Sequence, residues 1–172
     1  SGHKIYGPKG IGLFVFRPEL PLMPLIWGGG QERGLRPGTI PVPLVVGFAT
    51  AAQLAIQDLS AQRQKLLTLR NHLWQGLKQR LPNLMLNGSF SQRLENNLNF
   101  TVPDVLGNRL HKELKSFLAC SSGSACSQGA PSHVLIALGR SLPEAEASIR
   151  LSLGRNTTED EVSQVIEIIE NI

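Results

Sequence analysis

A long helical region that begins and ends at prolines constrains the fold of this chain more than any other feature. Pro41 and Pro43 open it, and leucines that recur at spacings of three and four between Leu66 and Leu77 predict an amphipathic helix. The helix must end before Pro82, because proline lacks the amide hydrogen that helix continuation needs. Short strand-like runs lie on both sides of this region, so the chain predicts an α/β or α+β layered fold.

Hydrophobic periodicity and turn residues predict the remaining elements. Ser141 with Glu144, and Thr158 with Glu161, have the spacing of helix-starting capping boxes. An amphipathic helix is expected over residues 107–117, and a short helix near Pro131. Strands are expected at residues 11–16, 22–27, 84–86, 97–102, 118–120 and 149–153.

Length and composition exclude several classes of function. The 172 residues can bury a core, and no apolar run approaches the roughly 20 residues of a membrane span, so no membrane partner is expected. The net charge of +4 comes from scattered basic residues and aromatics make up only 5%, which argues against nucleic-acid binding. The two cysteines, Cys120 and Cys126, lack metal-ligand spacing, so no metal site is expected, and they fit a reducing cytoplasm.

Two glycine-rich loops precede the long helical region. In residues 1–10, Lys4 follows His3 among three glycines, which suits a backbone that approaches an anionic ligand closely. Residues 28–39 contain five glycines, two arginines and a terminal Thr39, again typical of a loop near an anion. From the residues alone, an ordinary basic loop remains an alternative for residues 1–10.

Cys126 lies in a run of small residues, 121–127, that has little to bury. Such a segment favours an exposed thiol, as a nucleophile that must travel to its substrate requires. Cys120 follows apolar residues and fits a structural role instead. Catalytic and passive interpretations of Cys126 are open at this point.

Taken in order, four segments resemble the cysteine desulfurases of the class V group of pyridoxal-phosphate enzymes. They are SGHKIYGPKGIG, GGGQERGLRPGT, SSGSACS and SIRLSLGR. The resemblance covers essentially the whole chain and implies the fold of the aspartate-aminotransferase-like enzymes, pyridoxal-phosphate fold type I. It implies that residues 1–60 are the last part of the large cofactor domain, and residues 61–172 the small domain that carries the cysteine loop. The chain therefore resembles only the C-terminal part of such an enzyme, and we expect it to be inactive alone.

The resemblance also implies a role for each matching residue. Lys4 matches the lysine that carries pyridoxal phosphate as a Schiff base, and Ser1 and His3 match residues that hydrogen-bond the cofactor phosphate. Thr39 matches a threonine that reaches the cofactor of the other subunit, which implies a homodimer. Cys126 matches the nucleophile that takes sulfur from L-cysteine, and Arg150 matches the arginine that grips the substrate carboxylate.

The expected reaction leaves L-alanine and a persulfide on Cys126, which passes sulfur to an acceptor such as an iron–sulfur scaffold or a sulfur carrier. The segment 127–130 looks slightly shorter than in the longer-loop desulfurases, which would alter the reach of the thiol. Alternatives are a selenocysteine lyase, a class V aminotransferase and a non-catalytic module on which a sulfur acceptor docks. A phosphate-binding protein unrelated to pyridoxal phosphate is a further alternative.

Overall fold

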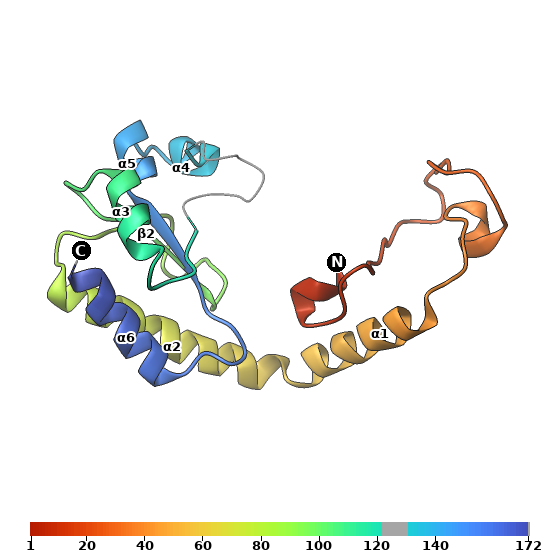
Figure 1. Cartoon of the computed structure of the whole chain (residues 1–172), viewed down its shortest axis with the longest axis horizontal. Helices are drawn as coiled ribbons and strands as arrows, with labels where there is room; N and C mark the ends of the chain where they lie inside the picture. The colour runs from red at the N-terminus through yellow and green to blue at the C-terminus, as the bar shows by residue number, and fades with distance from the viewer. Residues whose placement is uncertain (122–130, 172) are drawn as a thin grey trace. The chain divides into compact units, whose positions relative to one another are not determined.

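The computed structural model describes residues 1–121 and 131–171 of the chain (Figure 1). They form two compact units, Ser1–Ser60 and Ala61–Ile172, which we call the N-terminal and the C-terminal unit. Each unit is described by itself below.

The N-terminal unit contains two short 3-10 helices and one α-helix, and no strand is described in it. The 3-10 helices are η1 (Gly2–Ile5) and η2 (Gln31–Gly34), and the α-helix is α1 (Val42–Gln57). The strand predictions for residues 11–16 and 22–27 are therefore wrong for this structure. A strand forms only when a second strand pairs its N–H and C=O groups, and residues 1–60 supply none.

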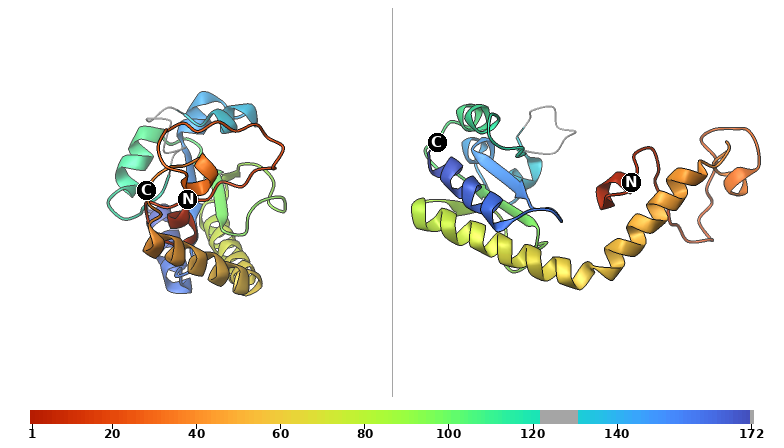
Figure 2. Two further views of the ribbon diagram at one scale, coloured as in Figure 1. Left: turned by 90° about the vertical axis from the view of Figure 1, so that its right-hand side faces the viewer. Right: turned by 60° about the horizontal axis from the view of Figure 1, so that its bottom comes forward.

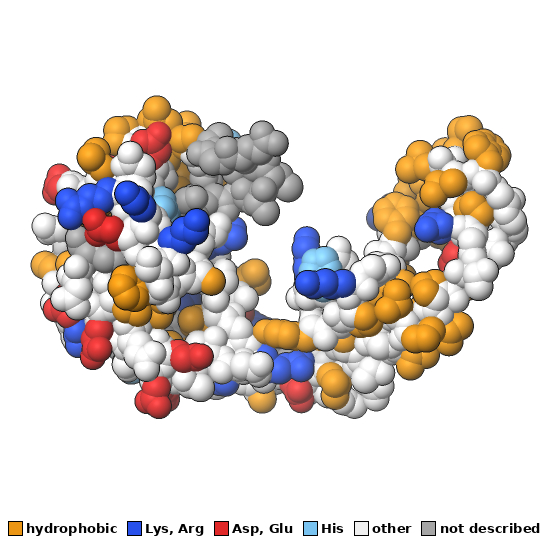
Figure 3. All heavy atoms as spheres, viewed as in Figure 1, with side chains coloured by type: hydrophobic (Ala, Val, Ile, Leu, Met, Phe, Trp, Pro, Cys, Tyr) orange, Lys and Arg blue, Asp and Glu red, His pale blue; other side chains and the backbone are white. Residues whose placement is uncertain are grey.

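Apolar side chains lie exposed over much of the N-terminal unit (Figure 3). Leu25 and Trp27 are 97% and 78% exposed, and Val15 is 80% exposed. Ala51 is the one residue of the buried hydrophobic core described among residues 1–60. Contiguous apolar surface of this kind marks an interaction surface in folded proteins, so this unit presents a face that suits another protein segment.

The long helical region is two helices, α1 and α2 (Leu59–Arg80), separated at Asp58. The single helix expected from the sequence is thus interrupted, at a residue whose side chain competes with the helix for backbone hydrogen bonds. The end of α2 at Arg80 confirms the stop expected before Pro82. No single described helix is long and apolar enough to cross a membrane, and α1 and α2 reach that length and composition only when counted together.

The C-terminal unit is built on an antiparallel sheet with strand order β1-β2-β3. The strands are β1 (Met85–Leu86), β2 (Asn97–Thr101) and β3 (Ser148–Ser152), close to three of the expected runs. The run 118–120 is irregular, and the following Ser121 forms an isolated bridge with Arg150 instead. The described bridge therefore places the chain just before residue 122 against β3.

One face of this sheet belongs to the hydrophobic core. Side chains alternate between the two faces of a strand, so Leu98 and Phe100 of β2 face the core with the neighbouring residues of β3. Helices α2 and α6 (Glu159–Glu170) lie side by side in both views of the unit (Figures 1 and 2). Gly76 permits their close approach, because a Cβ there would lie 2.4 Å from Ile166 Cδ1. The buried cluster comprises Leu69, Leu73, Leu77, Leu84, Leu98, Phe100, Leu110, Leu114, Ile149, Leu151, Val162, Ile166 and Ile169.

Three shorter helices complete the C-terminal unit: α3 (Gly107–Leu114), α4 (His133–Ala137) and α5 (Leu142–Glu146). Both predicted capping boxes are confirmed, at Ser141 for α5 and at Thr158 for α6. In each box the hydroxyl of the first residue accepts a hydrogen bond from the backbone N–H three residues on. The glutamate at that position accepts one from the backbone N–H of the first residue, so N–H groups at the start of the helix are paired.

Candidate active site

Ser1, His3 and Lys4 lie together in the first turn of the N-terminal unit, and all three are exposed. The turn is closed by its own backbone, since Lys4 N donates to Ser1 O at 3.2 Å. Gly2 N donates to Ile11 O at 2.9 Å, which ties the turn to the segment that follows. A hydroxyl, an imidazole and an ammonium group are thus presented within four consecutive residues.

Helix α1 supports this turn through contacts that only glycine allows. A Cβ on Gly2 would lie 2.9 Å from Pro8 O and 3.3 Å from Phe48 Cδ2 of α1. A Cβ on Gly7 would lie 2.9 Å from Gly2 O and 3.3 Å from Ala51 Cβ of α1. A Cβ on Gly47 of α1 would lie 2.9 Å from Pro8 Cγ. The glycines therefore let α1 pack directly against the backbone that carries Lys4.

The backbone is strained at the end of the same turn. Tyr6 follows η1 with φ at 65°, in the left-handed region that residues with a side chain seldom adopt. Such conformations persist where the surrounding structure imposes them, and they cluster at functional sites. Tyr6 is the C-cap of η1, a position where left-handed residues commonly end a helix.

Thr39 lies at the end of the second glycine-rich loop and is exposed. In this loop Glu32 and Arg33 have φ values of 48° and 58° inside η2. The Gln31 side chain accepts from Gly38 N at 3.1 Å and closes the loop next to Thr39. Gly34 and Gly38 also have positive φ, 78° and 112°, so glycine and non-glycine residues together form a compact turn.

Arg150 lies on β3 with its side chain exposed on the face opposite the core. Its neighbours Ile149 and Leu151 are buried, and this alternation turns Arg150 outward. Its backbone exchanges two hydrogen bonds with Ser121, Arg150 N to Ser121 O at 2.8 Å and Ser121 N to Arg150 O at 3.2 Å. The β-ladder places Asn99 of β2 directly opposite it on the other side.

Only one of the two cysteines, Cys120, lies among the described residues. Cys126, the predicted nucleophile, lies outside the described residues. Cys120 is a free, half-buried thiol that packs against the core cluster, as expected of a structural cysteine. Desolvation by burial raises the pKa of Cys120, which leaves less of the reactive thiolate at neutral pH.

The structure thus brings three of the predicted residues together, in the Ser1–Lys4 turn. Thr39 belongs to the same unit, and Arg150 belongs to the C-terminal unit. Sequence reasoning did not identify Asn99, which lies opposite Arg150. It also missed Asn87, which hydrogen-bonds Asn99, and Arg140, which hydrogen-bonds Asn87. The alternation of polar and apolar residues in 97–101 was a signal for Asn99, but its partners follow from strand register.

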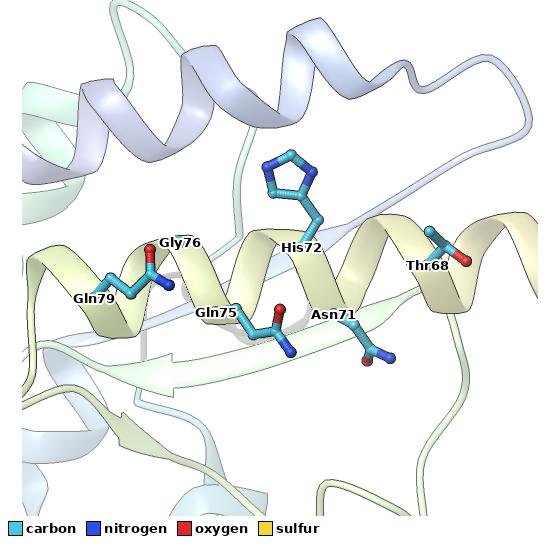
Figure 4. Close-up of a pocket in the computed structure, with 6 residues that line it drawn as sticks. All are labelled: Thr68, Asn71, His72, Gln75, Gly76 and Gln79. Carbon is cyan, nitrogen blue, oxygen red and sulfur yellow. The ribbon is translucent and has the colours of Figure 1, made fainter.

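Described hollows in the C-terminal unit lie away from these residues. A hollow of about 390 Å³ runs along α2, and Figure 4 shows that its six lining residues all belong to that helix. A second, of about 210 Å³, lies beside the turn after α2. His72 lines the first and is exposed. No group of metal-ligating side chains gathers among the described residues.

Residues 1–165 match the family model of the class-V aminotransferases. The chain belongs to this family. It is 47% identical to the cysteine desulfurase IscS of Klebsiella pneumoniae subsp. pneumoniae and 43% identical to that of Rickettsia typhi, over 98% of its own length. It spans 42% of the length of both relatives.

Solved structures agree with this assignment. A NifS-like protein superposes with a TM-score of 0.87 at 36% identity, over 99% of this chain and 44% of that one. A NifS-like protein from Rickettsia africae superposes with a TM-score of 0.77 at 31% identity, over 88% and 40%. The comparisons confirm the resemblance drawn from the four motifs and the pyridoxal-phosphate fold type I that it implied.

Enzymes of this family depend on pyridoxal phosphate, and the first turn of the chain fits that cofactor. A phosphate accepts hydrogen bonds, and the exposed Ser1 hydroxyl and His3 ring are able to donate them. An aldehyde reacts with a primary amine, and Lys4 supplies one in the same turn.

Proposed function

We propose that the protein containing this chain is a cysteine desulfurase, which takes sulfur from L-cysteine and releases L-alanine. The observation that carries the proposal is the similarity to cysteine desulfurases over nearly the whole chain. The roles of Lys4, Cys126 and Arg150 are assigned from the four sequence motifs. The exposure of Lys4 and Arg150 supports it, since both must reach small molecules.

In this proposal Ser1 and His3 hold the cofactor phosphate and Lys4 holds its aldehyde carbon. Pyridoxal phosphate held there would supply an electron sink for the bound amino acid. The Lys4 amine would also move a proton at the substrate Cα. Arg150 binds the substrate carboxylate through its planar pair of donors.

Cys126 supplies the thiolate that receives the sulfur. It attacks the substrate sulfur, so that an S–S bond forms as the Cβ–S bond breaks. The electron pair of the broken bond stays on the carbon, which takes up a proton to give L-alanine. Cys126 is left as a persulfide, and its outer sulfur passes to a thiol of an acceptor protein, which we propose to be an iron–sulfur scaffold or a sulfur carrier.

We further propose that residues 1–60 form the end of the large cofactor domain and residues 61–172 the small domain. The exposed apolar surface of the N-terminal unit supports this proposal, because an isolated domain would bury more of it. A homodimer is also proposed, in which Thr39 reaches the cofactor of the partner subunit. We propose a cytoplasmic location, where a reducing environment keeps the thiols of Cys120 and Cys126 free.

Substitution of each cysteine in turn tests the proposed function directly. In the intact protein loaded with pyridoxal phosphate, Cys126→Ser should abolish alanine formation from L-cysteine, and Cys120→Ser should retain it. Mass spectrometry of wild-type protein after one turnover should find the additional sulfur on the peptide that contains Cys126. Transamination of L-cysteine that survives Cys126→Ser would identify an aminotransferase instead. Turnover of selenocysteine alone would identify a selenocysteine lyase, and absence of a cofactor chromophore would favour a docking module.

A further inference from the structure

Asn99 and Arg150 are side-chain neighbours on the face of the sheet away from the core. They are register partners, so their side chains project to the same face. Both backbone hydrogen bonds of Arg150 go to Ser121, and Asn99 O accepts from Asn87 N at 2.9 Å. The Asn99–Arg150 pair is therefore of the non-hydrogen-bonded type, in which the Cα atoms lie about 4.5 Å apart and side chains are closest.

A series of hydrogen bonds sets which way the Asn99 amide points. Arg140 can only donate, and its Nε lies 2.6 Å from Asn87 Oδ1. The amide nitrogen of Asn87 must then face the other way, where it donates to Asn99 Oδ1 at 2.7 Å. With its oxygen engaged, Asn99 presents its NH₂ group on its remaining side.

This orientation is held firmly. Asn87 is 5% exposed, and its amide nitrogen also lies 3.1 Å from both Thr101 Oγ1 and Ser148 Oγ. Arg140 Nη2 donates to Leu86 O at 2.8 Å, which ties the guanidinium to the end of β1. Flipping the Asn87 amide would place NH₂ against a guanidinium, so the flip is excluded by chemistry.

The result is two adjacent side chains, the Arg150 guanidinium and the Asn99 NH₂ group, that both offer hydrogen-bond donors on this face. Arg150 is exposed and Asn99 is half-buried, so both are open to a small molecule on this face. A carboxylate has two oxygens that accept several hydrogen bonds and matches such a pair. We propose that Asn99 is a second donor to the substrate carboxylate beside Arg150, and that Asn87 and Arg140 are positioning residues that aim it. This inference rests on the proposed function, which assigns the carboxylate to Arg150.

The test measures carboxylate binding separately from turnover. In the intact protein with its cofactor bound, calorimetry gives the Kd of L-alanine, which carries the carboxylate and no sulfur. Asn99→Ala should raise that Kd about tenfold or more, as expected for loss of a hydrogen bond to a charged group. The KM for L-cysteine should rise in parallel, and the KM for L-cysteine methyl ester, which lacks the carboxylate, should not.

Asn97→Ala is the matched control, because Asn97 is the same residue type on the same strand and face but lies opposite Ser152. It should leave the Kd of L-alanine unchanged. Asn99→Asp keeps the acceptor for Asn87 and places a carboxylate beside Arg150. It should fold as the wild type does and bind L-alanine more weakly than Asn99→Ala, even if the alanine variant is destabilised.

The outcomes separate the two proposals. If wild-type protein forms no alanine from L-cysteine, the proposed function fails. If wild-type protein is active, Arg150→Ala abolishes L-alanine binding and both Asn99 variants bind L-alanine as the wild type does, the role of Asn99 is refuted and the function stands. Equal losses for the acid and the methyl ester would likewise refute carboxylate recognition, because they would show a general structural effect.

Discussion

Removal of the Arg140 guanidinium is the sharpest perturbation of the C-terminal unit. Arg140→Met keeps the apolar stem and deletes two hydrogen bonds to oxygen, to Asn87 Oδ1 at 2.6 Å and to Leu86 O at 2.8 Å, and a weaker one to Met85 Sδ at 3.6 Å. The ion pair with Glu144 is long, at 3.9 Å, and adds little. The loss therefore comes from the two acceptors that the guanidinium leaves behind.

The magnitude follows from the charge and burial of these contacts. Hydrogen bonds to a charged group contribute about 1.5–3 kcal/mol each. The Arg140 side chain is 23% exposed, and Asn87 Oδ1 retains the Thr101 hydroxyl at 3.2 Å, so the lower end applies. We expect Arg140→Met to reduce the free energy of unfolding by about 3 kcal/mol, a large part of the roughly 5–15 kcal/mol of a typical protein.

Urea unfolding followed by tryptophan fluorescence measures this change. Trp74 packs on Phe100 with ring centroids 6.2 Å apart, so its emission reports the core of the unit that holds Arg140. Arg140→Lys, which retains a single charged donor nitrogen, should recover part of the loss. Arg109→Met, which deletes an exposed pair with Glu113, should change nothing measurable. A loss below about 1 kcal/mol for Arg140→Met would refute the claim that these contacts are strong.

Three further outcomes are expected. Gly107→Ala should destabilise the protein by about 1–3 kcal/mol in urea unfolding despite the better helix propensity of alanine, because its Cβ would lie 2.3 Å from Glu146 O; unchanged or increased stability would contradict this contact. Thr158→Ala should cost about 1 kcal/mol, since it removes the cap that accepts from Glu161 N, and an unchanged urea midpoint would show that the cap is dispensable. Cys120 should react with iodoacetamide more slowly than an unstructured thiol at pH 8, because burial raises its pKa. The reaction rate of Cys120 should keep rising at higher pH. Mass spectrometry of timed samples measures the rate, and equal rates for Cys120 and the unstructured thiol would contradict the burial.

Local patterns allowed most of the C-terminal unit to be predicted from the sequence. Both capping boxes depend on residues three apart, and the amphipathic helix expected at 107–117 forms as α3 over Gly107–Leu114. The runs at 11–16 and 22–27 have strand composition and form no strand, because pairing depends on residues that the run itself does not contain. Strand propensity alone therefore predicted elements that the described N-terminal unit does not form.

The candidate site likewise contains residues that local sequence motifs predict and residues that only the folded structure brings together. The motif around Lys4 is local, and the structure places Ser1, His3 and Lys4 in one turn. The neighbours of Arg150 are not local, since Asn99 and Ser121 reach it only through strand register. A sequence shows which residues can donate, and register decides which donors stand side by side.

Arg150 and Lys4 are held in place by different parts of the structure, and this difference predicts how each will respond to mutation. Arg150 stands between Ile149 and Leu151, which are 0% and 7% exposed in a core shared with α2 and α6. Its position is therefore linked to the stability of the whole C-terminal unit, and core substitutions there should weaken substrate binding as they weaken folding. The turn that carries Lys4 rests instead on close backbone packing against α1 at Gly2 and Gly7. Added side chains at those glycines should displace Lys4 and reduce cofactor binding while leaving the C-terminal core intact.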